Sequence, residues 1–210
     1  MKIILDNSAK NGSGRYVEYI SSGLFKGAPG WSHPKRVIDD YAMLFIMDGE
    51  VFIREGNREF KLVSGDILVL APDAVHEGTY PSPGAVSYYW VHFRSDFFDA
   101  SDADSRYIHV SDGFQIQNLF KQLLHVVNSE NYPRYMAALY LAQIIGETEH
   151  TRIKTSRVSN ALASEVREYI KVNSVDEMLT LSRIAEHFGF SSDYVGRLFR
   201  SEFGIPVKDF

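Results

Sequence analysis

The 210-residue chain contains no cysteine, which excludes disulfide frameworks and the zinc or iron–sulfur sites that are built on thiolates. It also lacks any apolar run near the ~18 residues of a membrane span, and its best run extends from Ile67 to Ala71. The apolar run before Asp6 is only three residues long, from Ile3 to Leu5, too short for a secretory signal peptide. We therefore expect a cytoplasmic protein with no membrane segment.

A strong positive charge is absent as well. The net charge of -5 argues against a uniformly basic nucleic-acid binder. The charge is uneven, because residues 1–150 hold 13 basic against 19 acidic side chains and residues 151–210 hold 9 against 8. This near-neutral tail permits a small nucleic-acid-binding segment. Hydrophobic residues are 45% of the chain, an ordinary value that excludes wholesale disorder.

The first half of the chain has the pattern of β-structure. Short runs rich in β-branched and aromatic residues occupy 51–54, 58–62, 66–70 and 86–93, with turn signals such as Asp48-Gly49 and Ser64-Gly65 between them. This spacing predicts a sandwich or barrel. The stretch before Pro34 includes a Gly/Ser/Asn segment and has no clear period, so we expect an N-terminal arm there.

From Asp112 the apolar period becomes helical, and it resumes from Met136 to about His150. Two antiparallel helices packed on or beside the barrel are expected. The stripe on the first of them is more than one barrel face needs, so we predict a homodimer through residues 114–150 with Leu123 near its centre. The residues of this stripe are Leu119, Leu123 and Val126. Residues 148–160 are polar and lack an apolar face, which is typical of an interdomain linker.

The last fifty residues predict three short helices. Asn160, Thr180 and Ser191 are suited to cap them, the second helix ending at Gly189 and the third at Gly204. Residues 181–200 fit a helix-turn-helix unit, with a small residue where the helices cross, a glycine at the turn and apolar residues that bury the contact. These residues are Ala185, Gly189, Ile184, Val195 and Leu198. The alternative is an ordinary helical hairpin.

If the unit binds DNA, the exposed face of its second helix enters the major groove. Five residues are expected on that face: Ser192, Asp193, Gly196, Arg197 and Arg200. Arg197 is the best candidate to read a base, since a guanidinium can pair with two acceptors of guanine, and Arg200 is expected to meet phosphate. Asp193 is better placed to favour the helix N-terminus than to touch DNA. The alternative for each arginine is a solvated helix face.

The stretch from Leu179 to Pro206 closely resembles the first helix-turn-helix of AraC-type (AraC/XylS) transcription regulators, above all in Arg197-Leu198-Phe199, Phe203-Gly204 and Pro206. The first half resembles the sugar-responsive members of that family. Gly65-Asp66, Pro72 and His76 match a stretch of their cupin barrel, and the run from Trp90 to Phe93 matches its closing strand.

The resemblance implies an α+β protein of two domains. It implies a cupin-like barrel (a double-stranded β-helix) with its arm in 1–112, dimerisation helices in 113–150, a linker in 151–160 and a partial helix-turn-helix domain in 161–210. The implied partners are DNA, a small-molecule effector, a second copy of the chain and RNA polymerase. The family's DNA-binding domain has two such units joined by a long helix, whereas this chain stops at Phe210, so we expect a truncated fragment.

The barrel interior is the candidate ligand pocket. Tyr88, Trp90 and His92 share one strand face because side chains alternate along a strand. An indole can lie flat on a sugar ring, while Tyr, His and Arg bond to hydroxyls. The resemblance places Trp90 and Tyr88 in the pocket and makes Arg36 the anchoring arginine, and His76 and His92 complete the candidate set. The alternative is that Trp90, His76 and His92 are core residues.

The cupin resemblance also raises an enzyme alternative. Metal-dependent cupins of this kind use a His-x-His and a Glu, but residues 37–44 contain no histidine and Ala42 stands near the expected Glu. His76 alone would not hold a metal at useful affinity. No nucleophile elbow, phosphate loop or paired-carboxylate pattern occurs either. We expect a ligand-responsive regulator without cofactor, metal or catalysis; the alternatives are a non-catalytic carbohydrate sensor that acts through protein contacts and, after it, a metal-cupin isomerase.

Overall fold

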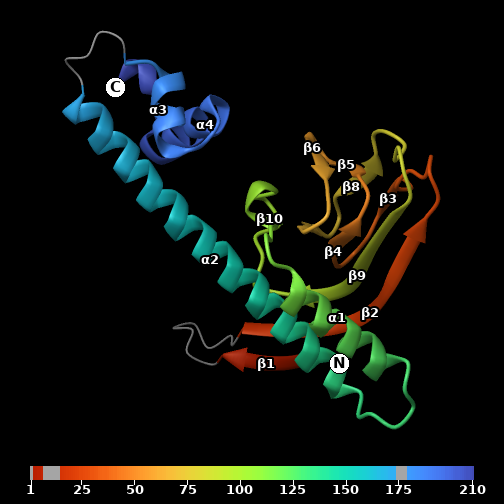
Figure 1. Ribbon diagram of the computed structural model, residues 1–210. Helices are drawn as coiled ribbons and strands as arrows, with labels where there is room; N and C mark the ends of the chain where they lie inside the picture. The colour runs from red at the N-terminus through yellow and green to blue at the C-terminus, as the bar shows by residue number, and fades with distance from the viewer. Residues whose placement is uncertain (1, 7–14, 174–178) are drawn as a thin grey trace. The chain divides into compact units, whose positions relative to one another are not determined.

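The computed structural model describes residues 2–6, 15–173 and 179–210, and these form two compact units, 1–149 and 150–210. The strands of the first unit are β1 Lys2–Asp6, β2 Arg15–Gly27, β3 Arg36–Val37, β4 Tyr41–Asp48, β5 Val51–Glu55, β6 Arg58–Leu62, β7 Asp66–Leu70, β8 Val75–Gly78, β9 Val86–Ser95 and β10 Tyr107–His109. The helices are α1 Phe114–Val127, α2 Tyr135–Val172, α3 Leu181–Phe188 and α4 Ser192–Phe203, with 3-10 turns η1 Asp104–Arg106 and η2 Val207–Asp209 (Figure 1).

Two antiparallel sheets make the barrel. The first has the strand order β1-β2-β9-β4-β7-β10, and the second has the order β3-β8-β5-β6. Alternate residues of β4, β7 and β9 face the second sheet and form the barrel core, as Leu44, Leu68 and Tyr88 do. The expected fold, an α+β chain with a cupin-like barrel and a helix-turn-helix, is confirmed.

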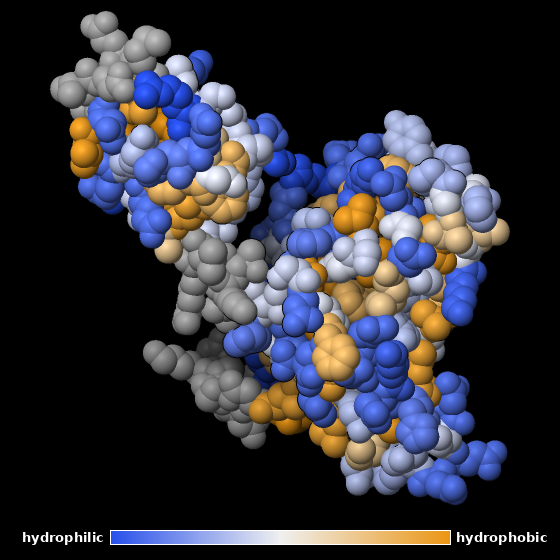
Figure 2. All heavy atoms as spheres, in the orientation of Figure 1, coloured by the Kyte–Doolittle hydropathy of each residue, from blue (hydrophilic) through white to orange (hydrophobic). Residues whose placement is uncertain are grey.

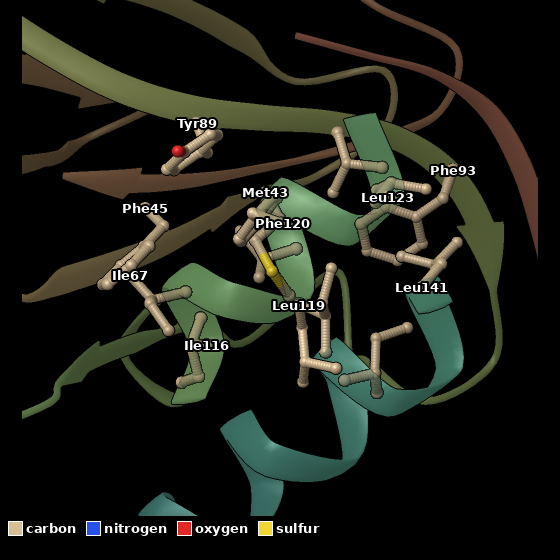
Figure 3. Packing of buried hydrophobic residues seen from close by; sticks show 14 of the residues in the cluster. Met43, Phe45, Ile67, Tyr89, Phe93, Ile116, Leu119, Phe120, Leu123 and Leu141 are labelled. Atoms are coloured by element: carbon tan, nitrogen blue, oxygen red, sulfur yellow. The ribbon is translucent and has the colours of Figure 1, made fainter. Parts of the chain in front are cut away.

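The other face of the first sheet is also buried, because α1 and the start of α2 cover it. Met43, Ile67 and Phe93 point to this side and pack against Phe120 and Leu141 (Figure 3). The ring of Phe120 stacks on that of Tyr89, with 5.2 Å between ring centroids. Because both faces of the sheet are buried, the residues of β7 from Ile67 to Leu70 are all apolar and do not alternate with polar ones.

The N-terminal arm expected before Pro34 is wrong for residues 15–27. These form β2, which pairs with β9 along most of its length and carries β1 on its other edge. The sequence of β2 shows no strand period for two reasons. A register shift between Tyr19 and Ser21 interrupts the alternation of buried and exposed side chains, and only Val17 of the strand is fully buried. The Gly/Ser/Asn segment, 7–14, lies outside the described residues.

The Gly65-Asp66 pair has a structural role. Gly65 has φ +90 at the turn before β7, and a Cβ there would lie 2.6 Å from the carbonyl oxygen of Val110. The buried carboxylate of Asp66 accepts hydrogen bonds from the Val63 amide (2.7 Å) and the Tyr107 hydroxyl (3.1 Å), and from His109 Nδ1 (2.7 Å). The pair therefore fixes the turn and holds β10 at the edge of the sheet.

The residues predicted at the centre of a dimer interface belong to the core of one chain. Leu123 is 0% exposed, and Leu119 and Val126 are buried with it. Leu119 and Leu123 join the cluster between the first sheet and the two helices, which lie side by side. The prediction that Leu123 lies near the centre of an interface is wrong, because Leu119 and Leu123 cover a second apolar face of the sheet. A dimer through other side chains of residues 114–150 stays a prediction.

The predicted helix end near His150 and the predicted cap at Asn160 are also wrong. Helix α2 is continuous from Tyr135 to Val172 and includes residues 151–160, expected to be a linker. That stretch has no glycine or proline, so nothing in its backbone chemistry stops a helix. The lack of an apolar face predicts that a segment packs against little else, but it does not by itself end a helix.

In the second unit, the predicted caps of the last two helices are confirmed. The Thr180 side chain accepts from the Arg183 amide, and that of Ser191 accepts from the Tyr194 amide. Gly189, with φ +75, ends α3 in the left-handed region that the turn requires. Ala185, Val195 and Phe199 are fully buried where the helices pack.

Most of the face of residues 1–149 seen in Figure 2 is hydrophilic, with hydrophobic atoms in scattered groups. None of the helices among the described residues combines the length and the apolar character that crossing a membrane requires.

Candidate functional site

All five side chains that the sequence predicts for ligand binding line one cavity of about 290 Å³ in the barrel. Tyr88, Trp90 and His92 come from one face of β9, Arg36 from β3 and His76 from β8. β3 and β8 are paired with Arg36 opposite His76, while β9 belongs to the facing sheet. The cavity therefore lies between the two sheets and is partly open to solvent, with a volume at the small end of the usual range for ligand pockets.

Trp90 is held by the strand beside it. It lies opposite Gly23 in the β2–β9 register, and a Cβ at Gly23 would come within 2.6 Å of Cζ2 of the indole. The glycine therefore lets the ring lie flat across β2. Trp90 is only partly buried and packs against the barrel core while lining the cavity, so it is not simply an enclosed core residue.

Three aromatic rings form a second wall. Trp31 packs on Phe25 with 4.6 Å between centroids, and Tyr88 lies 4.9 Å from Phe25. Burial raises the pKa of Tyr88 to about 12, while the charge of Arg36 acts in the opposite direction. Tyr88 is therefore a neutral phenol at physiological pH, able to donate or accept one hydrogen bond.

Among the cavity residues that sequence reasoning missed are Trp31 and His33. Both lie in the stretch before Pro34 that was expected to be an arm. The signal that could have found them is composition: Trp31 is one of only two tryptophans in the chain, and His33 follows it by two positions. Both tryptophans therefore line the same cavity.

The histidines of the cavity have different partners. His92 donates from Nδ1 to the carboxylate of Asp40 at 2.7 Å, a bond that orients the ring. His33 and His76 pack against each other with 5.2 Å between ring centroids. No three His, Asp or Glu side chains of the described residues are grouped so that they could hold a metal ion, and Ala42 lines the cavity near the position where metal-dependent cupins have a ligating Glu. The residues present do not fit a metal centre.

The second candidate surface is the exposed side of α4. Asp193, Arg197 and Arg200 are exposed at spacings that place them on one stripe of the helix. Arg197 Nη2 lies 3.3 Å from the Asp193 carboxylate, with both side chains mostly exposed. Such a surface pair is weak, so the guanidinium can exchange it for another acceptor.

Two of the five residues predicted for this surface lie differently. Gly196 faces α3, because a Cβ there would approach Cδ2 of Leu181 to 3.2 Å. The hydroxyl of Ser192 lies 3.3 Å from that of Ser182, also on α3. Both residues stay partly exposed, so they lie at the border of the outer face next to α3.

The chain is similar to several known proteins. The model of the AraC-like ligand binding domain matches residues 18–165. Among solved structures, ToxT from Vibrio cholerae aligns over 91% of this chain and 97% of its own, with TM-score 0.39 and 13% identity. A cupin superfamily protein from Desulfitobacterium hafniense aligns over 45% of this chain and 76% of its own, with TM-score 0.33 and 20% identity.

Curated relatives are transcription regulators. The chain is 24% identical over 181 residues to the arabinose operon regulatory protein of Escherichia coli, covering 80% of this chain and 61% of that protein. It is 37% identical over 71 residues to the uncharacterized HTH-type transcriptional regulator YisR of Bacillus subtilis, covering 34% of this chain and 24% of that one. It thus spans less than two thirds of these relatives. By the match over residues 18–165, the chain belongs to the family of proteins with an AraC-like ligand-binding domain.

Proposed function

We propose that the chain is the effector-sensing part, with a portion of the DNA-binding part, of a cytoplasmic AraC-type transcriptional regulator. Its effector is a carbohydrate bound in the barrel cavity, and no catalytic step takes place there. The observation that carries the proposal is the cavity itself, in which both tryptophans meet Tyr88, His76, His92 and Arg36. Flat aromatic faces beside a few polar groups suit a ring that has apolar faces and a hydroxyl rim.

Regulation requires that the effector bind two arrangements of the regulator with different affinity, since equal affinity shifts no equilibrium. A homodimer would supply these arrangements. Because Leu123 is buried within its own chain, a contact through residues 114–150 would use exposed side chains such as Tyr135 and Leu139. RNA polymerase is a further partner of the proposed regulator.

The proposal predicts that Trp90→Ala abolishes the response to the sugar. The side chain supplies a stacking face, so its removal should weaken binding at least tenfold, about 1.4 kcal/mol, with little change in the melting temperature. Tryptophan fluorescence is the readout for a panel of monosaccharides, since Trp31 remains as a reporter. Tyr89→Ala is the matched control on the opposite face of β9: it should lower stability and leave affinity unchanged. A Trp90 variant that loses about 3–5 kcal/mol of stability with unchanged affinity would make Trp90 a core residue only.

For DNA, the exposed stripe of α4 predicts different effects for its two arginines. Arg197→Ala should cost ~1–3 kcal/mol on the preferred sequence and relax discrimination at one base pair. Arg200→Ala should weaken binding to all sequences and reduce the salt slope by about 1. The measurement is fluorescence anisotropy at several salt concentrations, on DNA selected from a random library and on unselected DNA. Lys171→Ala, which removes the same charge from α2, is the control. Equal effects of Arg197→Ala on both DNAs would contradict base reading.

A further inference from the structure

Two buried histidines in the cavity have ring nitrogens without partners. His33 is 8% exposed and His76 is 1% exposed. Neither nitrogen of His33, and not Nδ1 of His76, has a hydrogen-bond partner among the described residues. A buried polar atom without a partner costs free energy, so proteins rarely keep one unless it serves another purpose. Both rings line the cavity, where a bound molecule can reach them.

Both imidazoles are neutral at physiological pH. Burial lowers the pKa of His33 to about 3, with smaller contributions from His76 and Arg36. Burial and then Arg36 also lower the pKa of His76, while a backbone bond to Ala74 and the charge of Glu55 act in the opposite direction. Each ring therefore offers one N–H donor and one acceptor nitrogen. Of the described residues that line the cavity, only Arg36 carries a permanent formal charge.

Arg36 is exposed and makes no ion pair with any described residue. Several carboxylates of the same unit already have partners. Asp40 binds His92, Asp39 binds Arg94, Glu55 binds Arg106, and Glu77 binds Arg54 and Lys35. Arg36 lines the cavity, and its positive charge acts to lower the pKa of His33, His76 and Tyr88. The cavity thus keeps one unmatched cation beside two neutral imidazoles with free nitrogens.

We propose that the effector is an acidic monosaccharide whose anionic group binds Arg36 beside the His33–His76 pair, with its ring against Trp90. The inference rests on the proposed function and narrows its ligand class. A carboxylate or a phosphate accepts two hydrogen bonds from a guanidinium and further ones from imidazole N–H groups. A neutral sugar can accept hydrogen bonds from Arg36 but offers it no opposite charge.

The test is a tryptophan fluorescence titration with matched pairs: D-galacturonate against D-galactose, D-glucuronate against D-glucose, and D-glucose 6-phosphate against D-glucose. We expect at least one acid to bind tenfold or more tighter than its neutral partner, and the uronate and phosphate arms identify the anionic group. Arg36→Gln should remove this preference. Lys35→Gln removes the same charge from the adjacent residue, which does not line the cavity, and should keep the preference.

His33→Leu gives a second readout that a merely structural role would not produce. It should raise the melting temperature, because it removes buried nitrogens that have no partner, and it should weaken binding of the acid several-fold. Circular dichroism checks that each variant is folded. Equal or tighter binding of every neutral sugar, or an acid preference that survives Arg36→Gln, would overturn the inference and leave the proposed carbohydrate sensor standing. Binding of benzoate with no response to any sugar would overturn the carbohydrate class itself.

Discussion

Replacement of Arg106 by methionine is expected to lower the free energy of unfolding by about 3–5 kcal/mol, among the largest effects of any single change in the barrel. The guanidinium is 2% exposed and meets the Glu55 carboxylate, itself 4% exposed, with 2.9 Å between Nη1 and Oε2. It also donates to the carbonyls of Val69, Asp99 and Ala100. Without it, a buried carboxylate loses its countercharge and three carbonyls lose a donor.

Chemical denaturation of the variant measures this effect. Arg58→Met is the matched control, because Arg58 pairs with Asp104 at the surface and its loss should change stability little. The double variant Arg106→Met/Glu55→Leu should recover part of the loss, since it leaves no unpaired charge in the core. A loss from Arg106→Met no larger than that from Arg58→Met would show that the pair is accessible to water.

Leu123→Ala is expected to lower the free energy of unfolding by about 2–5 kcal/mol, independently of protein concentration. The side chain is 0% exposed and lies in the cluster that joins α1 to the first sheet and to α2. Its truncation leaves a cavity between three elements that cannot all move inward.

The control is the next residue. Leu124 is only partly buried at the border of the same cluster, so Leu124→Ala should cost clearly less. Unfolding at several protein concentrations distinguishes a core residue from an interface residue. An interface residue would give a different result: the unfolding midpoint of the wild type would rise with protein concentration, and that of Leu123→Ala would rise less. That outcome would place Leu123 between two copies of the chain, as its spacing alone predicts.

The candidate site was largely predictable because its signal is local. Alternation along one strand puts Tyr88, Trp90 and His92 on one face, and the structure keeps them there. Trp31 and His33 were missed because their stretch has no period, and their backbones are held by distant residues: the Trp31 carbonyl accepts from the Ser82 amide and the His33 carbonyl from the Gly78 amide. Gly23, which makes room for Trp90, is likewise invisible without the register.

The sequence by itself determined the features that depend on neighbouring residues. These are the strands between 51 and 93, the helix caps at Thr180 and Ser191, the turn at Gly189 and the family resemblance. Each depends on backbone preferences or side-chain periods within a few positions. Only the tertiary structure decided what each apolar stripe covers. Leu123 could meet its own sheet or a second chain, because burial in either removes the same surface from water. The same holds for charge: only the fold shows that Asp40 pairs with His92 and Glu55 with Arg106, while Arg36 has no ion pair among the described residues.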